Sequence, residues 1–264
     1  MSVKDSAHIQ AVSLRKVYRS KRGPVEALQS VTMSANYGEF VTLLGPSGCG
    51  KSTLLMIVAG LLSSTEGEVF IDKEEVSRPR LDTGIVFQSP LLLPWHNIVN
   101  NVLYPIRLQR KPIKEYLAKA NELLEMTGLE SFKNHLPGEL SGGMQQRVAI
   151  CRALIHNPNL LLMDEPFSAL DTMTRDFMNQ ELLRIWQEYQ KTVLFVTHSI
   201  REAVYLSDRV LVMRCRPSTI IKEVIINLPR PRELEIQESE PFNRYVAELR
   251  RAIEESHAPS DLIC

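Results

Sequence analysis

The sequence predicts an α/β fold in which a mainly parallel sheet, with an antiparallel β layer, carries an inserted α-helical subdomain. Short apolar runs of strand length recur along the chain and alternate with helical segments, as in parallel sheets built from strand–helix–strand units. Residues 9–18 and 27–34 instead alternate apolar and polar side chains, as half-exposed antiparallel strands do. Between residues 89 and 158 the strand pattern gives way to amphipathic helical segments interrupted by proline.

The expected elements can be taken in chain order. A turn at residues 21–24 (KRGP) joins the two antiparallel strands. Short buried strands are expected at residues 39–44, 68–72, 83–88, 160–163 and 192–197, with a final strand pair at 210–213 and 220–226. Helices are expected at residues 52–59, 97–108, 114–127, 173–189 and 242–255. The helix at 173–189 lies between two parallel strands and provides the right-handed crossover that such a pair requires.

Length and composition limit the number of domains, the class of partner and the cellular compartment. A chain of 264 residues can form one large α/β domain with a subdomain, or two small domains. The 31 basic and 31 acidic residues cancel, which gives no global electrostatic reason to expect nucleic acid as a partner. Residues 1–10 contain no apolar stretch, so no secretory signal is expected, and no apolar run approaches the ~20 residues of a membrane span. The scattered cysteines, Cys49, Cys151, Cys215 and Cys264, have no metal-binding spacing and favour a reduced, cytosolic chain.

Residues 45–53 (GPSGCGKST), the phosphate loop, match the pattern G-x-x-x-x-G-K-[ST]. The apolar strand before them and the apolar helix after them are the context in which this motif binds a nucleoside triphosphate, and this context disfavours a glycine-rich turn with a chance lysine. We expect the Lys51 amine to reach the β- and γ-phosphates and the Ser52 hydroxyl to bind Mg2+. The candidate nucleotide-binding residues of the loop are Gly45, Pro46, Ser47, Gly48, Cys49, Gly50, Lys51, Ser52 and Thr53. The predicted core is therefore that of a P-loop NTPase.

A second element of nucleotide chemistry lies at residues 160–165 (LLLMDE), where an apolar strand ends in two acids. A carboxylate at the end of a parallel strand lies at the same sheet edge as the phosphate loop. We expect Asp164 to hold Mg2+ and Glu165 to accept a proton from the attacking water. Taken alone, Asp164 could instead cap a helix and Glu165 could be a solvated acid of its first turn.

A third element, residues 140–148 (LSGGMQQRV), predicts a helix capped by Ser141. Gly142 and Gly143 allow close backbone approach, and the helix start can bind an anion. By itself this pattern is more often plain capping. Placed between the two preceding motifs, however, Leu140–Met144 resembles the signature motif of ABC-transporter ATPases.

Further residues resemble marks of the same family, in the same order along the chain. Gln88 resembles the Q-loop glutamine, residues 168–171 (SALD) resemble the D-loop, and His198 resembles the switch histidine. Tyr18 is similar to the aromatic residue that stacks on adenine. The resemblance covers about residues 9–255 and implies catalytic roles for Lys51, Gln88, Glu165 and His198, with Mg2+ bound by Ser52, Gln88 and Asp164. Each mark alone could be a cap or a core residue.

The resemblance also implies a head-to-tail homodimer. In that family the phosphate loop of one subunit and the signature motif of the other enclose each ATP, so that Ser141, Gly142 and Gly143 would bind the nucleotide of a second copy. Two helix N-termini and a lysine on opposite sides of a triphosphate can neutralise charge that neither surface neutralises alone. ATP would then hold the dimer closed, and hydrolysis would release it.

A narrower resemblance points to importers of the nitrate/sulfonate/taurine type, including relatives that carry pyrimidine precursors. It rests on residues 89–95 (SPLLLPW) directly after Gln88, on Met144, and on residues 229–232 (PRPR). In those importers this region after the Q-loop receives a membrane permease. Leu91–Leu93 and Trp95 could equally pack within the subdomain. Two departures from the pattern are Ser218-Thr219 after Arg216-Pro217, and Ser199 after His198.

The sequence therefore predicts the ATP-binding and ATP-hydrolysing subunit of an ABC importer. It would act peripherally at the cytoplasmic face of the membrane, with permease subunits docking near Gln88–Trp95, a periplasmic or lipoprotein solute-binding protein acting indirectly, and no nucleic acid. The predicted divisions are residues 1–88 and 159–232 for the ATPase core, 89–158 for the helical subdomain and 233–264 for a C-terminal helical tail.

Two alternatives remain. The first is a soluble ABC ATPase acting on nucleic acid or ribosomes, but only about 50 residues separate Gln88 from Ser141, without a heptad array. The second is a P-loop metabolic kinase, which the signature motif and Glu165 disfavour. The transported solute is not encoded in these motifs.

Overall fold

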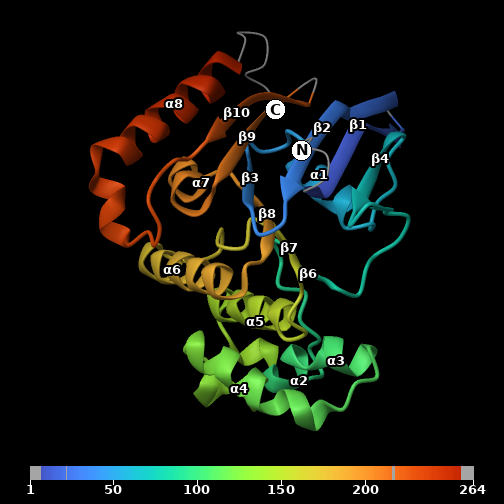
Figure 1. Ribbon diagram of the computed structural model, residues 1–264. Coiled ribbons are helices and arrows are strands. Elements are labelled where there is room, and N and C mark those ends of the chain that lie inside the picture. Colours follow the sequence, from blue (N-terminus) through green and yellow to red (C-terminus); the bar gives the residue numbers. More distant parts are fainter. Residues whose placement is uncertain (1–6, 22, 216–217, 257–264) are drawn as a thin grey trace.

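The structure, a computed structural model, describes residues 7–21, 23–215 and 218–256. Within these ranges the chain forms a six-stranded sheet of order β10-β9-β3-β8-β7-β6 and a four-stranded sheet of order β2-β1-β4-β5. Figure 1 shows the helices α2 to α5 gathered at one end of the molecule, at the bottom of the view. The four-stranded sheet lies at the upper right, and α7 and α8 lie on the opposite side, at the left. The predicted α/β fold with an antiparallel layer and an inserted group of helices is confirmed.

The strands and helices have the following bounds. The strands are β1 (Ala7–Ser20), β2 (Gly23–Asn36), β3 (Phe40–Leu44), β4 (Glu66–Ile71), β5 (Glu74–Glu75), β6 (Thr83–Val86), β7 (Leu160–Asp164), β8 (Thr192–Thr197), β9 (Arg209–Arg214) and β10 (Thr219–Ile225). The α-helices are α1 (Lys51–Val58), α2 (Ile98–Val102), α3 (Tyr104–Leu108), α4 (Leu117–Met126), α5 (Gly142–Leu154), α6 (Thr172–Tyr189), α7 (Ile200–Leu206) and α8 (Glu240–Ser256). Short 3₁₀ turns occur at Ile113–Tyr116, Glu130–Phe132, Pro137–Glu139 and Leu234–Glu238.

The strands β3, β8, β7 and β6 are parallel to one another and form the centre of the larger sheet. Every residue of β3, β7 and β8 is buried, as expected of strands covered on both faces. The register pairs Leu44 with Thr197, and Asp164 with Val196, so these strands end at the same edge. Whatever follows each strand is therefore brought to one place, at the carboxyl edge where α/β sheets bind ligands.

The two layers share a core around α1. This helix contacts β7 and β8 of the larger sheet as well as β2 and β4 of the antiparallel layer. Leu54, Leu55 and Val58 of α1 are fully buried there. Because the apolar side chains of α1 face both sheets, the helix that follows the phosphate loop is fixed in position from two sides.

The helical region differs from the sequence prediction in detail. The helix predicted at 97–108 is divided into α2 and α3, because Pro105 in the first turn of α3 has no N–H to continue the hydrogen-bond ladder. The helix predicted from Lys114 begins as a 3₁₀ turn and becomes α-helical at Leu117. The sequence analysis missed α7, whose start does carry a signal: Ser199 caps the helix through the N–H of Glu202, three residues on.

The C-terminal helix α8 is amphipathic, as predicted, and packs against α7, β9 and β10. Its buried residues Phe242, Val246, Leu249 and Ala252 recur at helical spacing on one face. Of the features noted in the sequence, Arg216-Pro217 and Cys264 lie outside the described residues. No helix in the described part of the chain has both the length and the apolar character needed to cross a bilayer.

Residues 229–232 hold this C-terminal part against α7. The buried Arg232 guanidinium donates to the carbonyl oxygens of Val204, Tyr205 and Ser207 at 2.8–3.1 Å, and to that of Ile226 at 3.3 Å. These include the last carbonyls of α7, where a positive charge also interacts favourably with the helix dipole. Burial lowers the pKa of Arg232 to about 10, so it remains charged at neutral pH. In this structure the PRPR segment therefore attaches the C-terminal part of the chain to α7 through the hydrogen bonds of Arg232.

Replacing this guanidinium should destabilise the fold. We expect Arg232→Met to lower the free energy of unfolding by about 2–4 kcal/mol, because several buried carbonyls lose a charged donor. Urea unfolding followed by circular dichroism would measure the change. Arg250, exposed on α8, provides the matched control. Arg250→Met also deletes a guanidinium, but one that is exposed to solvent, so the free energy of unfolding should stay nearly unchanged. Equal stability of the two variants would contradict a stabilising role for the Arg232 hydrogen bonds.

Candidate functional site

The phosphate loop connects β3 to α1 through a backbone that tolerates only glycine at its tightest points. Gly50, at the N-cap of α1, has a φ of 86°. A Cβ atom on Gly50 would lie 2.6 Å from the carbonyl oxygen of Ala27, and one on Gly45 would lie 2.5 Å from that of Met213. The loop is therefore held between the second strand of the antiparallel layer and the end of β9.

The Lys51 side chain crosses this loop. It is 4% exposed, and its Nζ donates to the carbonyl oxygens of Gly45 and Pro46, each at 2.8 Å. The first N–H groups of a helix have no intrahelical partner, so the start of α1 and the lysine together offer positive charge at one point. Burial raises the pKa of the nearby Cys49 thiol, which favours the neutral form of this small side chain in the loop.

Two of the three side chains predicted to bind Mg2+, Ser52 and Asp164, are in direct contact. Ser52 Oγ donates to Asp164 Oδ1 at 2.9 Å, although 112 positions separate them. Asp164 is 5% exposed, and burial raises the pKa of its carboxyl, while the hydrogen bond from Ser52 opposes that shift. A buried carboxylate next to a hydroxyl is a ligand set suited to a hard divalent cation.

Glu165 leaves the sheet directly after Asp164. Its backbone has a φ of 44°, an uncommon value for a residue with a side chain, and its N–H donates to the carbonyl oxygen of Val196 at 2.9 Å. Its carboxylate lies 3.0 Å from Nδ1 of His198, the first residue after β8. The Glu165 side chain is 14% exposed and that of His198 is 56% exposed. The structure thus brings together the predicted general base and the predicted switch histidine.

Tyr18 and Gln88 lie at the borders of this region. The Tyr18 hydroxyl, near the end of β1, is 3.4 Å from the Thr53 hydroxyl in α1, and its ring is 39% exposed. Gln88 is exposed, two residues after β6. The backbone just before it is fixed by Gln146 of α5, whose Nε2 donates to the Phe87 carbonyl oxygen at 2.9 Å.

The signature residues lie apart from the phosphate loop of the same chain. Ser141 caps α5 through the N–H of Met144 at 3.3 Å, and both Ser141 and Gly142 are exposed. α5 packs against the edge strand β6, three strands away from β3, which corresponds to roughly 14 Å across the sheet. Asp171 likewise caps α6 through the N–H of Thr174 at 3.1 Å. Within one chain, capping is what these two residues do.

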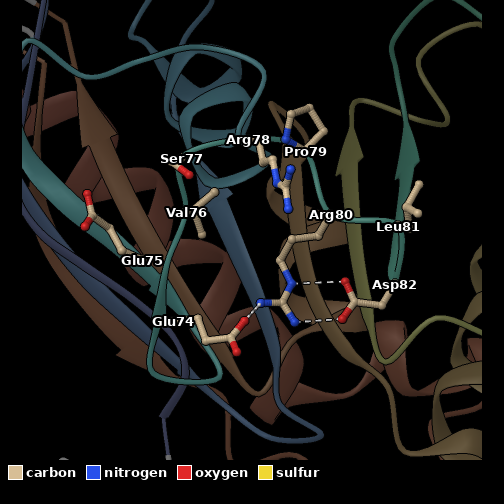
Figure 2. Close-up of a pocket in the computed structure, with 9 residues that line it drawn as sticks. All are labelled: Glu74, Glu75, Val76, Ser77, Arg78, Pro79, Arg80, Leu81 and Asp82. Carbon is tan, nitrogen blue, oxygen red and sulfur yellow. Dashed lines mark hydrogen bonds and ion pairs between the residues drawn. The ribbon is translucent and has the colours of Figure 1, made fainter.

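Two hollows lie near the helical region. A groove of about 370 Å³ lies between β6, α3 and the loop after Gln88, and its lining includes Phe87, Leu91, Tyr104 and Arg152. A larger hollow, of about 840 Å³, is lined by residues 74–82 alone. Figure 2 shows Arg80 there, between Glu74 and Asp82, with ion pairs to both. None of the predicted ATP-site residues borders that larger hollow.

Sequence reasoning missed several residues that organise the site. Arg152 donates to the carbonyl oxygens of Pro90 and Leu91 at 2.7 and 2.8 Å and so fixes the loop after Gln88. Gln146 holds the backbone at Phe87. Arg175 and Glu202 lie beside the Glu165–His198 pair, in a small hollow that all four line. Only Glu202 carried a signal, as the third residue after a capping serine.

Comparison with known proteins identifies relatives over most of the chain. The family model described as ABC transporter matches residues 28–168. An uncharacterized ABC transporter ATP-binding protein of Methanocaldococcus jannaschii is 48% identical over 225 residues, 85% of this chain and 84% of the relative. An aliphatic sulfonates import ATP-binding protein of Bacillus cereus is 44% identical (82% and 85% covered), and a nitrate import ATP-binding protein of Synechocystis is 45% identical (86% and 85%).

A solved structure is also similar. It is a dimeric ATP-binding cassette in a post-hydrolysis state, bound to ADP and Pi, with a TM-score of 0.76 and 36% sequence identity. The match covers 84% of this chain and 100% of that one.

The raised pKa of Asp164 has a consequence for stability. A carboxyl whose pKa is higher in the folded than in the unfolded state destabilises the fold once it is ionised, and the effect disappears when the carboxyl is protonated in both states. We therefore expect Asp164→Asn to raise the Tm of the nucleotide-free protein at pH 7 by a few degrees, about 2–4 °C for each kcal/mol.

The difference from the unmutated chain should shrink as pH falls toward 3.8, the ordinary pKa of aspartate. Scanning calorimetry over a pH series would measure it. The control is Asp82→Asn, which should not raise the Tm, because the hydrogen bond from Arg80 lowers the pKa of Asp82. An Asp164→Asn variant that is less stable at pH 7 would contradict the burial argument.

Proposed function

Because the chain belongs to the ATP-binding proteins of ABC transporters and is an ATP-hydrolysing enzyme, we propose that it drives uptake of a small solute of the nitrate/sulfonate/taurine or pyrimidine-precursor type. The observation that carries this proposal is the convergence of three segments at one sheet edge. Lys51 and Ser52 follow β3, Asp164 ends β7, Glu165 follows it, and His198 follows β8. Relatives named for import of sulfonates and nitrate support the solute class.

Within this site each side chain has a proposed role. The Lys51 amine and the first N–H groups of α1 bind the phosphates, and Tyr18 stacks against the base. Ser52, Asp164 and Gln88 would hold Mg2+ together with phosphate oxygens and water. When bound, this ion would neutralise charge on the phosphates.

Glu165 is the proposed general base. Its carboxylate accepts the proton of the attacking water, a contribution typically worth about 10²–10⁴-fold in rate. His198 lies 3.0 Å from that carboxylate and can orient it by hydrogen bonding. Gln88 lies at the border between the sheet and the helical region. Its proposed role is to move the loop that follows it when nucleotide binds or is hydrolysed.

The site requires a second copy of the chain. Ser141, Gly142 and Gly143 form a helix start with exposed Ser141 and Gly142, across the sheet from the phosphate loop of the same chain. We propose that they bind the nucleotide of a partner subunit in a head-to-tail homodimer, which ATP closes and hydrolysis opens. The dimeric form of the similar cassette with ADP and Pi supports this arrangement.

Mixing two inactive variants would test the shared site. Lys51→Ala removes phosphate binding, and Ser141→Arg blocks the signature, so each variant alone should lose most ATPase activity. In a head-to-tail mixed dimer one site carries both defects and the other carries none. An equimolar mixture should therefore recover activity, up to about a quarter of the unmutated rate if subunits pair at random and each site works independently.

Measurement is by phosphate release at saturating ATP. Ser141→Arg alone should keep near-normal ATP binding by its own phosphate loop. A mixture as inactive as the separate variants would mean that the signature acts within its own chain, and would overturn the shared site.

The permease is proposed to dock in the groove after Gln88. Leu91 and Leu108, which line this groove, are 60% and 62% exposed, and Trp95, in the same loop as Leu91, is 71% exposed. Exposed apolar side chains of this size mark an interaction surface. Arg152 holds the 90–91 backbone in position beneath it. We propose that the chain divides into an ATPase core (residues 1–88 and 159–232), a helical subdomain (89–158) and a C-terminal tail (233–264). We also propose that it lies peripherally at the cytoplasmic face of the membrane.

Charge at this surface should uncouple the ATPase from transport. We expect Trp95→Asp to leave the ATPase rate of the isolated chain unchanged but to abolish co-purification with the permease and solute uptake in cells. Ile225→Asp, a change at a 60% exposed residue on β10, is the matched control and should retain both. Normal uptake with Trp95→Asp would refute docking at this site.

A further inference from the structure

An ion pair between a buried carboxylate and a half-buried guanidinium lies beside the Glu165–His198 contact, in the hollow that all four residues line. Glu202, on α7, is 9% exposed, and its Oε1 lies 3.6 Å from Nε of Arg175, on α6. That separation is an ion pair rather than a hydrogen bond. Burial raises the pKa of the Glu202 carboxyl, whereas Thr197 and Arg175 oppose that shift. Removal of Arg175 would leave the buried Glu202 charge poorly compensated.

Glu202 fixes the segment that carries His198. Its Oε2 accepts a hydrogen bond from Thr197 Oγ1 at 2.6 Å, and Thr197 directly precedes His198. The same hydroxyl accepts from the Ser199 N–H at 3.0 Å, and Ser199 Oγ accepts from the Glu202 N–H at 3.3 Å. The turn on both sides of His198 is thus hydrogen-bonded to Glu202, through its carboxylate on one side and its backbone N–H on the other.

Arg175 fixes the segment that follows Glu165. Its guanidinium donates to the Leu170 carbonyl oxygen at 2.8 Å and to that of Phe167 at 3.3 Å. Ser168, between them, donates back to the Glu165 carbonyl oxygen at 2.9 Å. One arginine therefore holds the whole loop between Glu165 and the start of α6.

We propose that Glu202 and Arg175 are a positioning pair that holds the His198 turn against the loop after Glu165, and so sets the approach of His198 to the catalytic carboxylate. A hollow of about 20 Å³, large enough for one water molecule, is lined by Glu165 and His198 and also by Arg175, Thr197 and Glu202. Glu202 is bonded to Thr197, which adjoins His198, and Arg175 is bonded to Phe167, two residues after Glu165. The contacts described above join neither residue to the phosphate loop. Their contribution is to the rate of hydrolysis and not to nucleotide binding.

The test uses the full chain in a steady-state ATPase assay, with ATP affinity and Tm measured on the same samples. Glu202→Gln and Arg175→Met should each lower kcat by about 10–100-fold, the cost expected of a small misplacement of reacting groups. Affinity for ATP should stay within about twofold, because ground-state binding is not affected. Arg175→Lys, which keeps the charge, should recover part of the kcat lost in Arg175→Met.

The double variant Glu202→Gln/Arg175→Met should be no slower than the slower single variant, because the two residues act as one unit. Arg184→Met is the matched control on the same helix. It breaks the ion pair of Arg184 with Glu181, at 2.9 Å, and should leave kcat unchanged.

Three results would overturn the inference: an unaltered kcat in Glu202→Gln, additive losses in the double variant, or kcat, affinity and Tm falling together, as a purely structural role predicts. The inference rests on the ATPase activity of the unmutated chain. An unmutated chain without ATPase activity would overturn both the inference and the proposed function, whereas an active chain with an equally active Glu202→Gln variant would overturn the inference alone.

Discussion

The parallel register of β3, β8 and β7 is the constraint on which the rest of the structure depends. Because Leu44 pairs with Thr197 and Val196 pairs with Asp164, three segments far apart in the sequence end at one edge. The phosphate loop, the Asp164–Glu165 pair and His198 are simply what comes next along each segment. A shift of one residue in β3 or β7 would move its side chains to the opposite face and separate Ser52 from Asp164.

This edge is arranged for a charged ligand at some cost to the nucleotide-free protein. Asp164 is buried with a raised pKa, and the Lys51 amine donates to carbonyl oxygens and to the Cys49 sulfur of its own loop. Glu165 adopts a positive φ that few side chains favour. Polar groups held in place before the ligand binds need little reorganisation when charge develops, which is the usual source of electrostatic catalysis. The well-packed α1, fixed between two sheets, supports this arrangement.

Side chains from distant helices connect the site to its surroundings. Gln146 and Arg152 of α5 hold the backbone before and after Gln88, so the helix that begins with the signature residues also fixes the loop proposed to meet the permease. A displacement of α5 would necessarily move that loop. Arg175 and Glu202 do the same for the two segments around Glu165 and His198. In each case long side chains bind backbone carbonyls or a neighbouring side chain, an arrangement that transmits position over several ångströms.

The sequence by itself determined the fold class, nearly all strands, and the residues that meet at the carboxyl edge. Those features depend on local patterns: glycine spacing, apolar runs of strand length, and acids at strand ends. The tertiary structure alone decided the rest. Arg232, Arg152, Arg175 and Glu202 form contacts with carbonyl oxygens or side chains that no motif specifies. A pattern can indicate that a side chain is chemically able to act, but the atoms within its reach depend on which segments the fold places beside it.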